Sequence, residues 1–207
     1  MNSVSDSVAG VVLAGGLSRR MGGGDKALLP LAGQPMIGHV VAGLRAQAHP
    51  LAINANGDPA RFSTFGLPVI CDSIQGHAGP LAGILAGLDW CSGLRPSPSR
   101  LLTVPADTPF LPGDLVARLQ DAAGNGKPAI AASAGRMHPV AALWPLAIRG
   151  RLAAFLADPG NRSVMAFLHQ GPFATADFPC PEGRDPFANI NTPEDLARAG
   201  RRMAQGC

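Results

Sequence analysis

The sequence predicts a doubly wound α/β domain with one mainly parallel sheet that spans residues 1–207. Short apolar runs of strand length alternate along the chain with stretches whose apolar residues recur at the 3.6-residue period of a helix. Hydrophobic residues make up 46% of the chain, enough for one sizeable core, and no shift in composition marks a second domain. The first apolar run also opens into a glycine-rich loop, as in many α/β folds that bind ligands at the carboxyl ends of their strands.

Composition excludes several classes of function. The formal charge is only +3, lysine and arginine are mostly scattered, and tyrosine is absent, so we expect no nucleic-acid partner. No apolar run approaches about 18 residues, so we expect no membrane partner. The four cysteines form no C-x-x-C pair and the start of the chain has no secretory pattern, which together predict idle thiols in a reducing cytoplasm.

The first predicted strand, Val11–Ala14, leads into a loop with five glycines and the cations Arg19, Arg20 and Lys26. Glycines let backbone N–H groups converge on an anion, and the cations add full charge, so the loop has the chemistry of a polyphosphate cradle. It differs from the common P-loop because Asp25 precedes the lysine and no Ser or Thr follows it. The alternative is an ordinary solvated turn with a solvated lysine.

Two further strands are expected to end beside this loop. Pro35 opens a predicted helix at Met36–Gln47, and strands follow at Leu51–Asn54 and Val69–Asp72. Each of these strands closes with a polar residue. In a parallel sheet, carboxyl ends share one edge, so Asn54 and Asp72 would stand in one row with the glycine loop, unless they merely serve the turns.

The second half continues the alternation. Gly79–Cys91 is a predicted helix with Pro80 in its first turn, Ser92–Ser99 an exposed connection, and Leu101–Val104 a buried strand. Further helices are expected at Pro112–Ala123, Leu146–Ala157 and Ser163–His169, and further strands at Ala129–Ala132, Val140–Trp144 and Phe173–Phe178. Thr192 and Pro193 have the pattern of a helix start, and the amphipathic helix Leu196–Met203 is expected to cover the sheet.

Asp107 is the best metal candidate in the sequence. It follows a buried strand at the expected ligand edge, and Pro105 and Pro109 stiffen its loop. A carboxylate is the hard oxygen ligand that Mg²⁺ prefers. The alternative is that Asp107 caps the turn with a bond to Thr108 or to the residue beyond.

Several motifs together resemble a known family. Leu13-Ala14-Gly15-Gly16, Arg20-Met21-Gly22-Gly23 and Asp25-Lys26 closely resemble the signature of molybdenum cofactor guanylyltransferases, which join GMP to molybdopterin. Cytidylyl-transferring relatives usually have Ala-Ala at positions 15–16, and sugar-phosphate relatives usually have Pro before the lysine. The resemblance extends from Gly10 to about Leu196 and includes the Asp-Thr-Pro element at 107–109, the His-Pro-Val element at 138–140 and the Asn-x-Asn-Thr-Pro element at 189–193.

The resemblance implies a set of site residues and ligands. It implies Arg20, Lys26 and Asp107 as the catalytic residues, with Mg²⁺ on Asp107 and the phosphates on the two cations. It implies nucleotide binding by Leu13, Ala14, Gly15, Gly16, Lys26, Asn54, Asp72 and Asp107. It associates molybdopterin with Gly79, Gly83, Arg162, Asn189 and Asn191, of which Arg162 suits the terminal phosphate and Asn191 is a second candidate for the metal shell. Both asparagines are alternatively plain helix-start residues.

The implied reaction transfers GMP from GTP to molybdopterin or its molybdenum form, with apo-molybdoenzymes or their chaperones as downstream partners. His138 is expected to be structural or to line the substrate, because a phosphate monoester is already an adequate nucleophile. We hypothesise that Gly15-Gly16 leaves room for the guanine base. The alternatives are CMP transfer, nucleotide transfer to a sugar phosphate, and a non-catalytic GTP or cofactor carrier.

Overall fold

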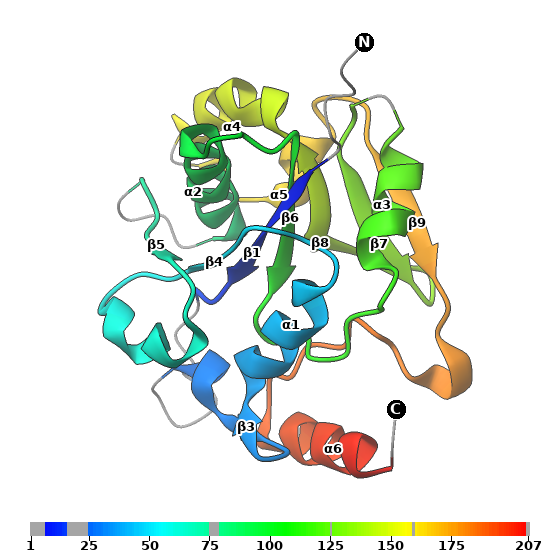
Figure 1. The fold of residues 1–207 in the computed structure, drawn as a ribbon. Helices are drawn as coiled ribbons and strands as arrows, with labels where there is room; N and C mark the ends of the chain where they lie inside the picture. The colour runs from blue at the N-terminus through cyan, green and yellow to red at the C-terminus, as the bar shows by residue number, and fades with distance from the viewer. Residues whose placement is uncertain (1–6, 16–24, 75–78, 125, 159, 206–207) are drawn as a thin grey trace.

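The fold is a seven-stranded sheet between two layers of helices (Figure 1). It is seen in a computed structural model that describes residues 7–15, 25–74, 79–124, 126–158 and 160–205. The strand order is β5-β4-β1-β6-β8-β7-β9. The bounds are Val8–Leu13 for β1, Leu51–Asn54 for β4, Val69–Ile70 for β5, Arg100–Pro105 for β6, Ala129–Ser133 for β7, Arg136–Pro145 for β8 and Ala174–Phe178 for β9.

The sheet is parallel except where β8 runs antiparallel to β6 and β7. This confirms the predicted doubly wound, mainly parallel sheet. Central strand β1 pairs with β4 and β6, and all six of its residues are buried. Its side chains alternate between two hydrophobic clusters, with Val8 and Val12 on one face and Ala9 and Val11 on the other. A strand covered on both faces must be apolar throughout, which explains its continuous apolar run.

Helices cover the two faces in separate groups. On one face lie α1 (Met36–Arg45) and α3 (Leu115–Ala123), and on the other lie α2 (Pro80–Gly93), α4 (Arg149–Leu156) and α5 (Val164–Leu168). None of the helices in the described part of the chain is long and apolar enough to cross a membrane. The core therefore divides into two apolar layers, one on each side of the sheet.

Most predicted elements are present, with shifted ends. Strand β4 has the predicted bounds, whereas β5 is shorter than predicted and β8 begins at Arg136 instead of Val140. The predicted helix at Leu146–Ala157 divides into a 3₁₀ turn, η3 (Leu146–Ile148), and α4. Short elements that were not predicted are the 3₁₀ segments η1 (Lys26–Leu28), η2 (Pro59–Phe65) and η4 (Pro181–Gly183), and the hairpin of β2 (Pro30–Leu31) with β3 (Gln34–Pro35).

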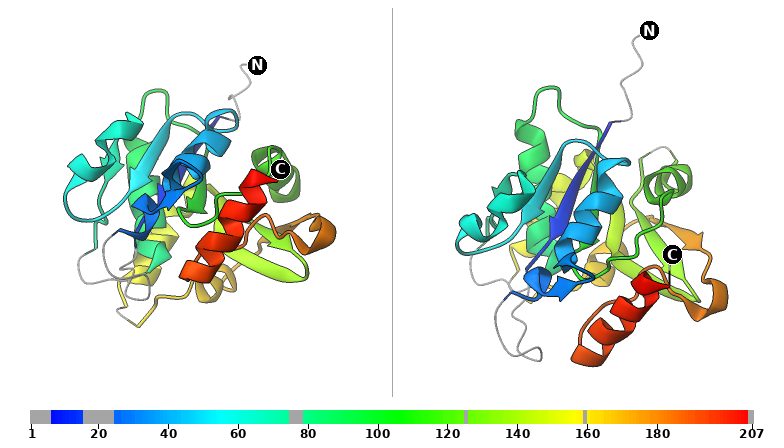
Figure 2. Two further views of the ribbon diagram at one scale, coloured as in Figure 1. Left: turned by 90° about the horizontal axis from the view of Figure 1, so that it is seen from below. Right: turned by 60° about the horizontal axis from the view of Figure 1, so that its bottom comes forward.

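The last helix, α6 (Pro193–Ala204), begins as predicted but lies elsewhere. Thr192 caps it and forms a capping box with Asp195. The prediction that this helix covers the sheet is wrong, because Ala199 is its one buried residue and packs in a separate cluster with Leu31 and Met36. Figures 1 and 2 show α6 below the ends of β1 and β6, beside the β2–β3 hairpin. A helix with so narrow an apolar side cannot cover a sheet face.

Candidate active site

Three side chains from distant parts of the chain meet at the carboxyl edge of the sheet. The Lys26 Nζ donates to Asp107 Oδ2 and to Asn191 Oδ1, each at 2.6 Å. Lys26 opens η1, Asp107 follows β6, and Asn191 precedes α6. We call this group the junction. The sequence predicted all three residues as site residues, and the structure brings them together.

Backbone contacts hold Asp107 in place. The Thr108 hydroxyl donates to the Pro105 carbonyl at 2.9 Å, and the Asp107 carbonyl accepts from the Ile190 N–H at 3.0 Å. The turn is therefore closed by Thr108, and the alternative that the Asp107 carboxylate caps it is wrong. The bond to Ile190 also fixes the segment that carries Asn191 beside the junction.

The Asp107 carboxylate suits a divalent metal ion. Its Oδ1 is buried and has no hydrogen-bond partner among the described residues, while Oδ2 contacts Lys26. A buried carboxylate oxygen without a donor is unfavourable unless a cation or water supplies the missing contact. The described residues contain no group of three or more His, Cys, Asp or Glu side chains that could hold a metal. This fits Mg²⁺, which commonly takes one or two carboxylates and completes its shell with phosphate and water.

The predicted row of Asn54 and Asp72 is present, and a third residue completes it. Asn54 Nδ2 donates to Asp72 Oδ1 at 2.9 Å, and Asn56 Nδ2 donates to Asp72 Oδ2 at 2.8 Å. The Asp72 N–H donates in turn to Asn56 Oδ1 at 3.0 Å. We call this group the amide edge. Sequence reasoning missed Asn56, although its spacing two residues after Asn54 was a usable signal.

Glycine positions explain how the amide edge is packed. A Cβ on Gly83 in α2 would lie 2.2 Å from Asn54 Oδ1, so only glycine fits there without moving Asn54. Gly79 lies elsewhere, beside the Arg162 carbonyl, which is 3.6 Å from where its Cβ would be. The residues predicted to handle molybdopterin therefore fall into three places: Gly83 at the amide edge, Gly79 with Arg162, and the two asparagines before α6.

The start of the glycine loop is only partly described. Leu13 and Ala14 are buried, and their backbone atoms bond to Ala106 N–H at 3.0 Å and to Asn54 O at 2.8 Å. Gly15 is exposed, and a Cβ on it would meet no atom of the described residues within 4 Å. Gly16, Arg19 and Arg20 lie outside the described residues, so the predicted roles of Gly16 and Arg20 stay predictions.

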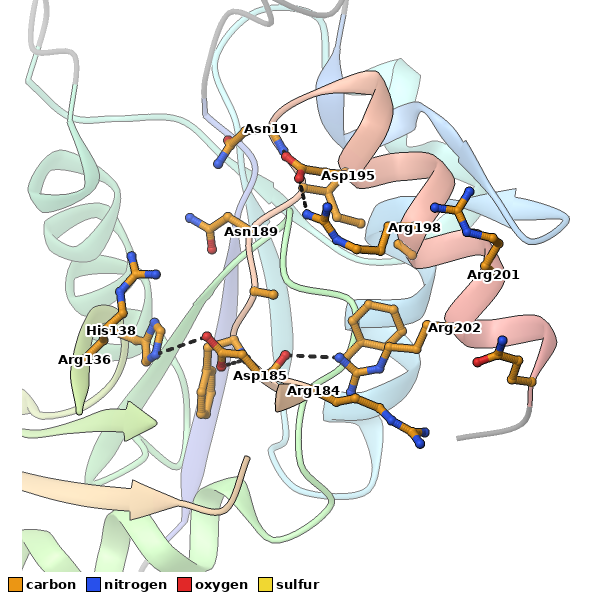
Figure 3. Close-up of a pocket in the computed structure, with 16 residues that line it drawn as sticks. Arg136, His138, Arg184, Asp185, Asn189, Asn191, Asp195, Arg198, Arg201 and Arg202 are labelled. Carbon is orange, nitrogen blue, oxygen red and sulfur yellow. Dashed lines mark hydrogen bonds and ion pairs between the residues drawn. The ribbon is translucent and has the colours of Figure 1, made fainter. Parts of the chain in front are cut away.

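On the other side of the junction lies a cleft of about 680 Å³. It is enclosed by α6, the segment 184–191 and the start of β8, and we call it the α6 cleft (Figure 3). Asn189 and Asn191 both line it, with buried Ile190 between them. The two asparagines therefore face the same side. The cleft has the volume of an ordinary small-molecule site.

His138 belongs to a partly buried polar cluster at the wall of this cleft. The Ser133 hydroxyl donates to Asp185 Oδ1 and contacts His138 Nε2, each at 2.7 Å. Because the single hydroxyl proton points to Asp185, Nε2 of His138 must be the protonated nitrogen. Burial lowers the pKa of His138, an effect that Asp185 opposes and Arg136 reinforces, so the imidazole is neutral at pH 7. Sequence reasoning missed Ser133 and Asp185, which carry no motif of their own.

The fold and the junction are those expected of an α/β nucleotidyltransferase, a class of enzyme whose active site positions a polyphosphate among cations. Residues 10–172 match the family model described as MobA-like NTP transferase domain, and the chain belongs to this family. Membership also suggests, in general terms, the use of a divalent metal.

Known proteins agree with this assignment. The chain is 50% identical over 205 residues to a molybdenum cofactor guanylyltransferase from Bradyrhizobium sp. (strain ORS 278), covering 98% of this chain and 96% of the relative. Among solved structures, molybdopterin-guanine dinucleotide biosynthesis protein A from Archaeoglobus fulgidus has a TM-score of 0.72 at 21% identity, covering 95% and 99% of the two chains. A manganese complex of Rv0371c from Mycobacterium tuberculosis H37Rv has a TM-score of 0.67 at 19% identity, covering 94% and 98%. The expected resemblance to molybdenum cofactor guanylyltransferases is thereby confirmed.

Proposed function

We propose that the protein transfers GMP from GTP to the terminal phosphate of molybdopterin or of its molybdenum form. An oxygen of that phosphate attacks the α-phosphorus of GTP in line, the bond from the α-phosphorus to the bridging oxygen breaks, and pyrophosphate leaves. The product is the molybdopterin guanine dinucleotide cofactor. The observation that carries the proposal is the junction of Lys26, Asp107 and Asn191, which shares Asn191 with the α6 cleft and lies at the same edge of the sheet as the amide edge.

Lys26 and Arg20 are the proposed phosphate ligands. Lys26 already lies among oxygen atoms at the sheet edge, and its flexible stem lets the ammonium move from Asp107 to a phosphate. Both cations would offset the negative charge that gathers on the phosphates in the transition state, which is the main task of a phosphoryl-transfer site. Arg19 is the proposed outward partner of Arg20.

Asp107 is the proposed ligand of Mg²⁺, with Asn191 as the second candidate. The orphaned Oδ1 of Asp107 supports this assignment, and the manganese complex of the mycobacterial neighbour is consistent with a hard divalent ion in this fold. When bound, the ion supplies charge neutralisation and alignment of the phosphates. Asp107 would hold it from a loop that the Ile190 N–H and Thr108 hydroxyl keep in place.

The amide edge is the proposed nucleoside site. Each oxygen of Asp72 accepts one amide hydrogen from the protein, and a carboxylate oxygen has a second lone pair for a ligand. Asp72 can therefore accept from a ribose hydroxyl or from the guanine amino group. Gly15 and Gly16 are the proposed reason that a purine fits, and because a Cβ on Gly15 would meet none of the described residues, Gly15→Ala is the variant that tests nucleotide choice.

Arg162 and Gly79 are the proposed contacts for the acceptor phosphate, together with Asn189 and Asn191 for the rest of molybdopterin. Apo-molybdoenzymes or their chaperones are the proposed recipients of the product. The proposed location is the cytoplasm, where reducing conditions preserve thiols such as those of Cys71, Cys91 and Cys180.

The test is pyrophosphate release with purified protein, Mg²⁺ and molybdopterin, in the presence of GTP, CTP or ATP. We expect release with GTP and little with the other two. Release with CTP in preference to GTP would make the protein a cytidylyltransferase. No release with any nucleotide, despite measurable GTP binding, would favour a non-catalytic carrier and contradict the proposal.

A further inference from the structure

The α6 cleft is strongly positive. Five arginines line it, at positions 136, 184, 198, 201 and 202, against two carboxylates. Both carboxylates are engaged within the protein, because Asp185 accepts from Ser133 and from the Phe187 N–H, and Asp195 accepts from backbone N–H groups at the start of α6. The cleft therefore favours an anion over a neutral or cationic ligand.

Most of these arginines already have partners. Arg184 pairs with Glu182, Arg198 with Asp195, and Arg202 donates to the Asp185 carbonyl and lies over the Phe110 ring. Arg136 and Arg201 are different, since neither guanidinium donates to any acceptor in the part of the chain that the structure describes. These two groups are available to a ligand.

Of these two arginines, only Arg136 lies on the side of the segment 184–191 to which the side chains of Asn189 and Asn191 point. Figure 3 shows the side chains of Asn189 and Asn191 directed towards Arg136 and His138, whereas Arg201 extends from α6 on the other side of the segment. The local sequence explains this placement. Ala134 and Gly135 have positive φ angles of 48° and 73° and form a tight hairpin turn, so Arg136 opens β8 opposite Ser133.

Strand alternation then sets the direction of each side chain. Residues two apart on a strand share a face, so Arg136 and His138 face the cleft together while Met137, 48% exposed, faces away. His138 is held by Ser133 and is neutral, so Arg136 is the group on this wall that brings full positive charge. The Arg136 guanidinium and the amides of Asn189 and Asn191 line the same cleft, and all three can donate hydrogen bonds to an anion there.

The acceptor has two anionic ends. Its terminal phosphate must reach the α-phosphorus of GTP at the junction. The second anionic group is the dithiolene, whose two sulfur atoms ionise as thiolates, and it must lie away from the junction. The cleft starts at the junction, because Asn191 belongs to both. A ligand with its phosphate at the junction and its body in the cleft brings its second anionic group towards Arg136.

We infer that Arg136 binds the dithiolene of molybdopterin, in the part of the α6 cleft that faces Asn189 and Asn191. This inference rests on the proposed function, because it takes molybdopterin as the acceptor. Arg136 would then select the acceptor by binding the acceptor's second anionic group. Arg136 would take no part in the bond exchange at phosphorus.

The experiment is an equilibrium binding cycle without GTP, followed by the fluorescence of the pterin ring. The protein variants are wild type, Arg136→Gln and, as a control of equal charge change on the other side of the cleft, Arg201→Gln. The two ligands are molybdopterin and its bis-S-carboxamidomethyl derivative, in which both thiolates become neutral thioethers while the phosphate is unchanged.

We expect Arg136→Gln to weaken binding of molybdopterin about 10- to 100-fold, the range for a hydrogen bond to a charged group. Wild type should lose a similar factor with the alkylated ligand, and Arg136→Gln should then lose nothing further, because both changes remove the same contact. Arg201→Gln should bind like wild type.

Three results would overturn the inference. If Arg136→Gln weakens binding of both ligands equally, Arg136 binds the phosphate. If Arg136→Gln leaves the affinity unchanged, Arg136 does not belong to the site. If Arg201→Gln weakens binding as much as Arg136→Gln, the loss of affinity comes from the overall charge of the cleft. Failure of the proposed function has a different signature, because wild type would then release no pyrophosphate with GTP and the acceptor, whatever the affinities of the variants.

Discussion

The two sides of the junction are built from different chemistry. At the amide edge the charged group is a carboxylate, Asp72, and its neighbours are the neutral side chains of Asn54 and Asn56. In the α6 cleft the charged groups are mostly guanidinium groups, and the carboxylates are already satisfied by the protein. One side is suited to accept hydrogen bonds from a neutral ligand, and the other to bind an anion.

This difference gives the site a direction. A nucleoside presents N–H and O–H donors, which match Asp72, and an anionic acceptor matches the cleft. In the proposed reaction, the phosphates of the two ligands would meet at Lys26 and Asp107, where the cation and the candidate metal ligand lie. Substitutions on the two sides should therefore separate nucleotide binding from acceptor binding, while those at the junction should stop the reaction.

The largest effect is expected at Asp107. Replacing Asp107 by alanine should lower transfer about a thousandfold, because the proposed metal ligand is lost and single electrostatic groups at active sites are worth up to about this factor. The matched control is Asp114→Ala, which removes an exposed carboxylate 3.6 Å from Arg118 and should leave the rate unchanged. Steady-state pyrophosphate release measures both, and full activity of Asp107→Ala would remove the metal assignment.

A smaller effect is expected at Lys26. We predict that Lys26→Met lowers kcat about a hundredfold, because one charge-stabilising donor is lost from the transition state. It should also tighten binding of Mn²⁺ to the protein without nucleotide, because the ammonium that occupies Asp107 Oδ2 is gone. Rapid-quench kinetics and metal titration report the two effects, and exposed Lys127→Met is the control. Weaker Mn²⁺ binding in Lys26→Met would contradict the competition between lysine and metal.

Gly83 tests the amide edge alone. Alanine at this position would place its Cβ against Asn54 Oδ1, so Gly83→Ala should displace Asn54, lower the free energy of unfolding by about 1–3 kcal/mol and raise the KM for GTP. The KM for the acceptor should change little. Gly150→Ala in α4 meets nothing within 4 Å and should be neutral, or stabilise by up to about 1 kcal/mol. A raised KM for the acceptor alone would show that Gly83 belongs to the other side.

The smallest effect concerns the cap of α6 at the cleft. Asp195 accepts a hydrogen bond from the Asn191 N–H, and this bond is the largest cause that lowers the pKa of Asp195 in the folded protein. Hydrogen bonds from Thr192 and Arg198 lower the pKa further. Ionised Asp195 therefore contributes stability above its unfolded pKa, and the contribution is lost as pH falls through the folded value. Asp195→Asn should cost about 1 kcal/mol near neutral pH, a typical value for a cap.

Denaturant melts of wild type and Asp195→Asn across the acid range check the sign of this effect. The difference between the two proteins should shrink as the pH falls below the usual range of an aspartate. A difference that grows on acidification would mean that Asp195 is not held as a carboxylate.

Local patterns were sufficient to predict two residues of the amide edge. β4 ends at Asn54 because three apolar residues followed by a polar one fit a short buried strand that ends at the sheet edge. Asn54 and Asp72 follow from the rule that parallel strands bring their carboxyl ends to one edge, whereas Asn56 was missed. On the other side, a local pattern predicted the start of α6 at Thr192, whose side chain caps a free backbone N–H group. Gly83 was selected by resemblance, and its packing against Asn54 was visible only in the structure.

The other side depends on contacts that no local pattern specifies. Lys26 and Asn191 are 165 positions apart, and Ser133 and Asp185 are 52 apart. The position of α6 also escaped prediction, because the periodicity of a helix gives the apolar side but not the partner it packs against. Arg136 lay two residues before a motif histidine, and only the antiparallel course of β8 directs both residues into the cleft.

The most direct test of the account is a crystal structure of the protein with Mg²⁺ and a GTP analogue that has a methylene bridge between its α- and β-phosphates. The account predicts the metal on Asp107, the Lys26 ammonium on a phosphate, and the nucleoside against Asp72. An analogue bound elsewhere, with Lys26 still paired to Asp107 and no metal beside that carboxylate, would contradict it.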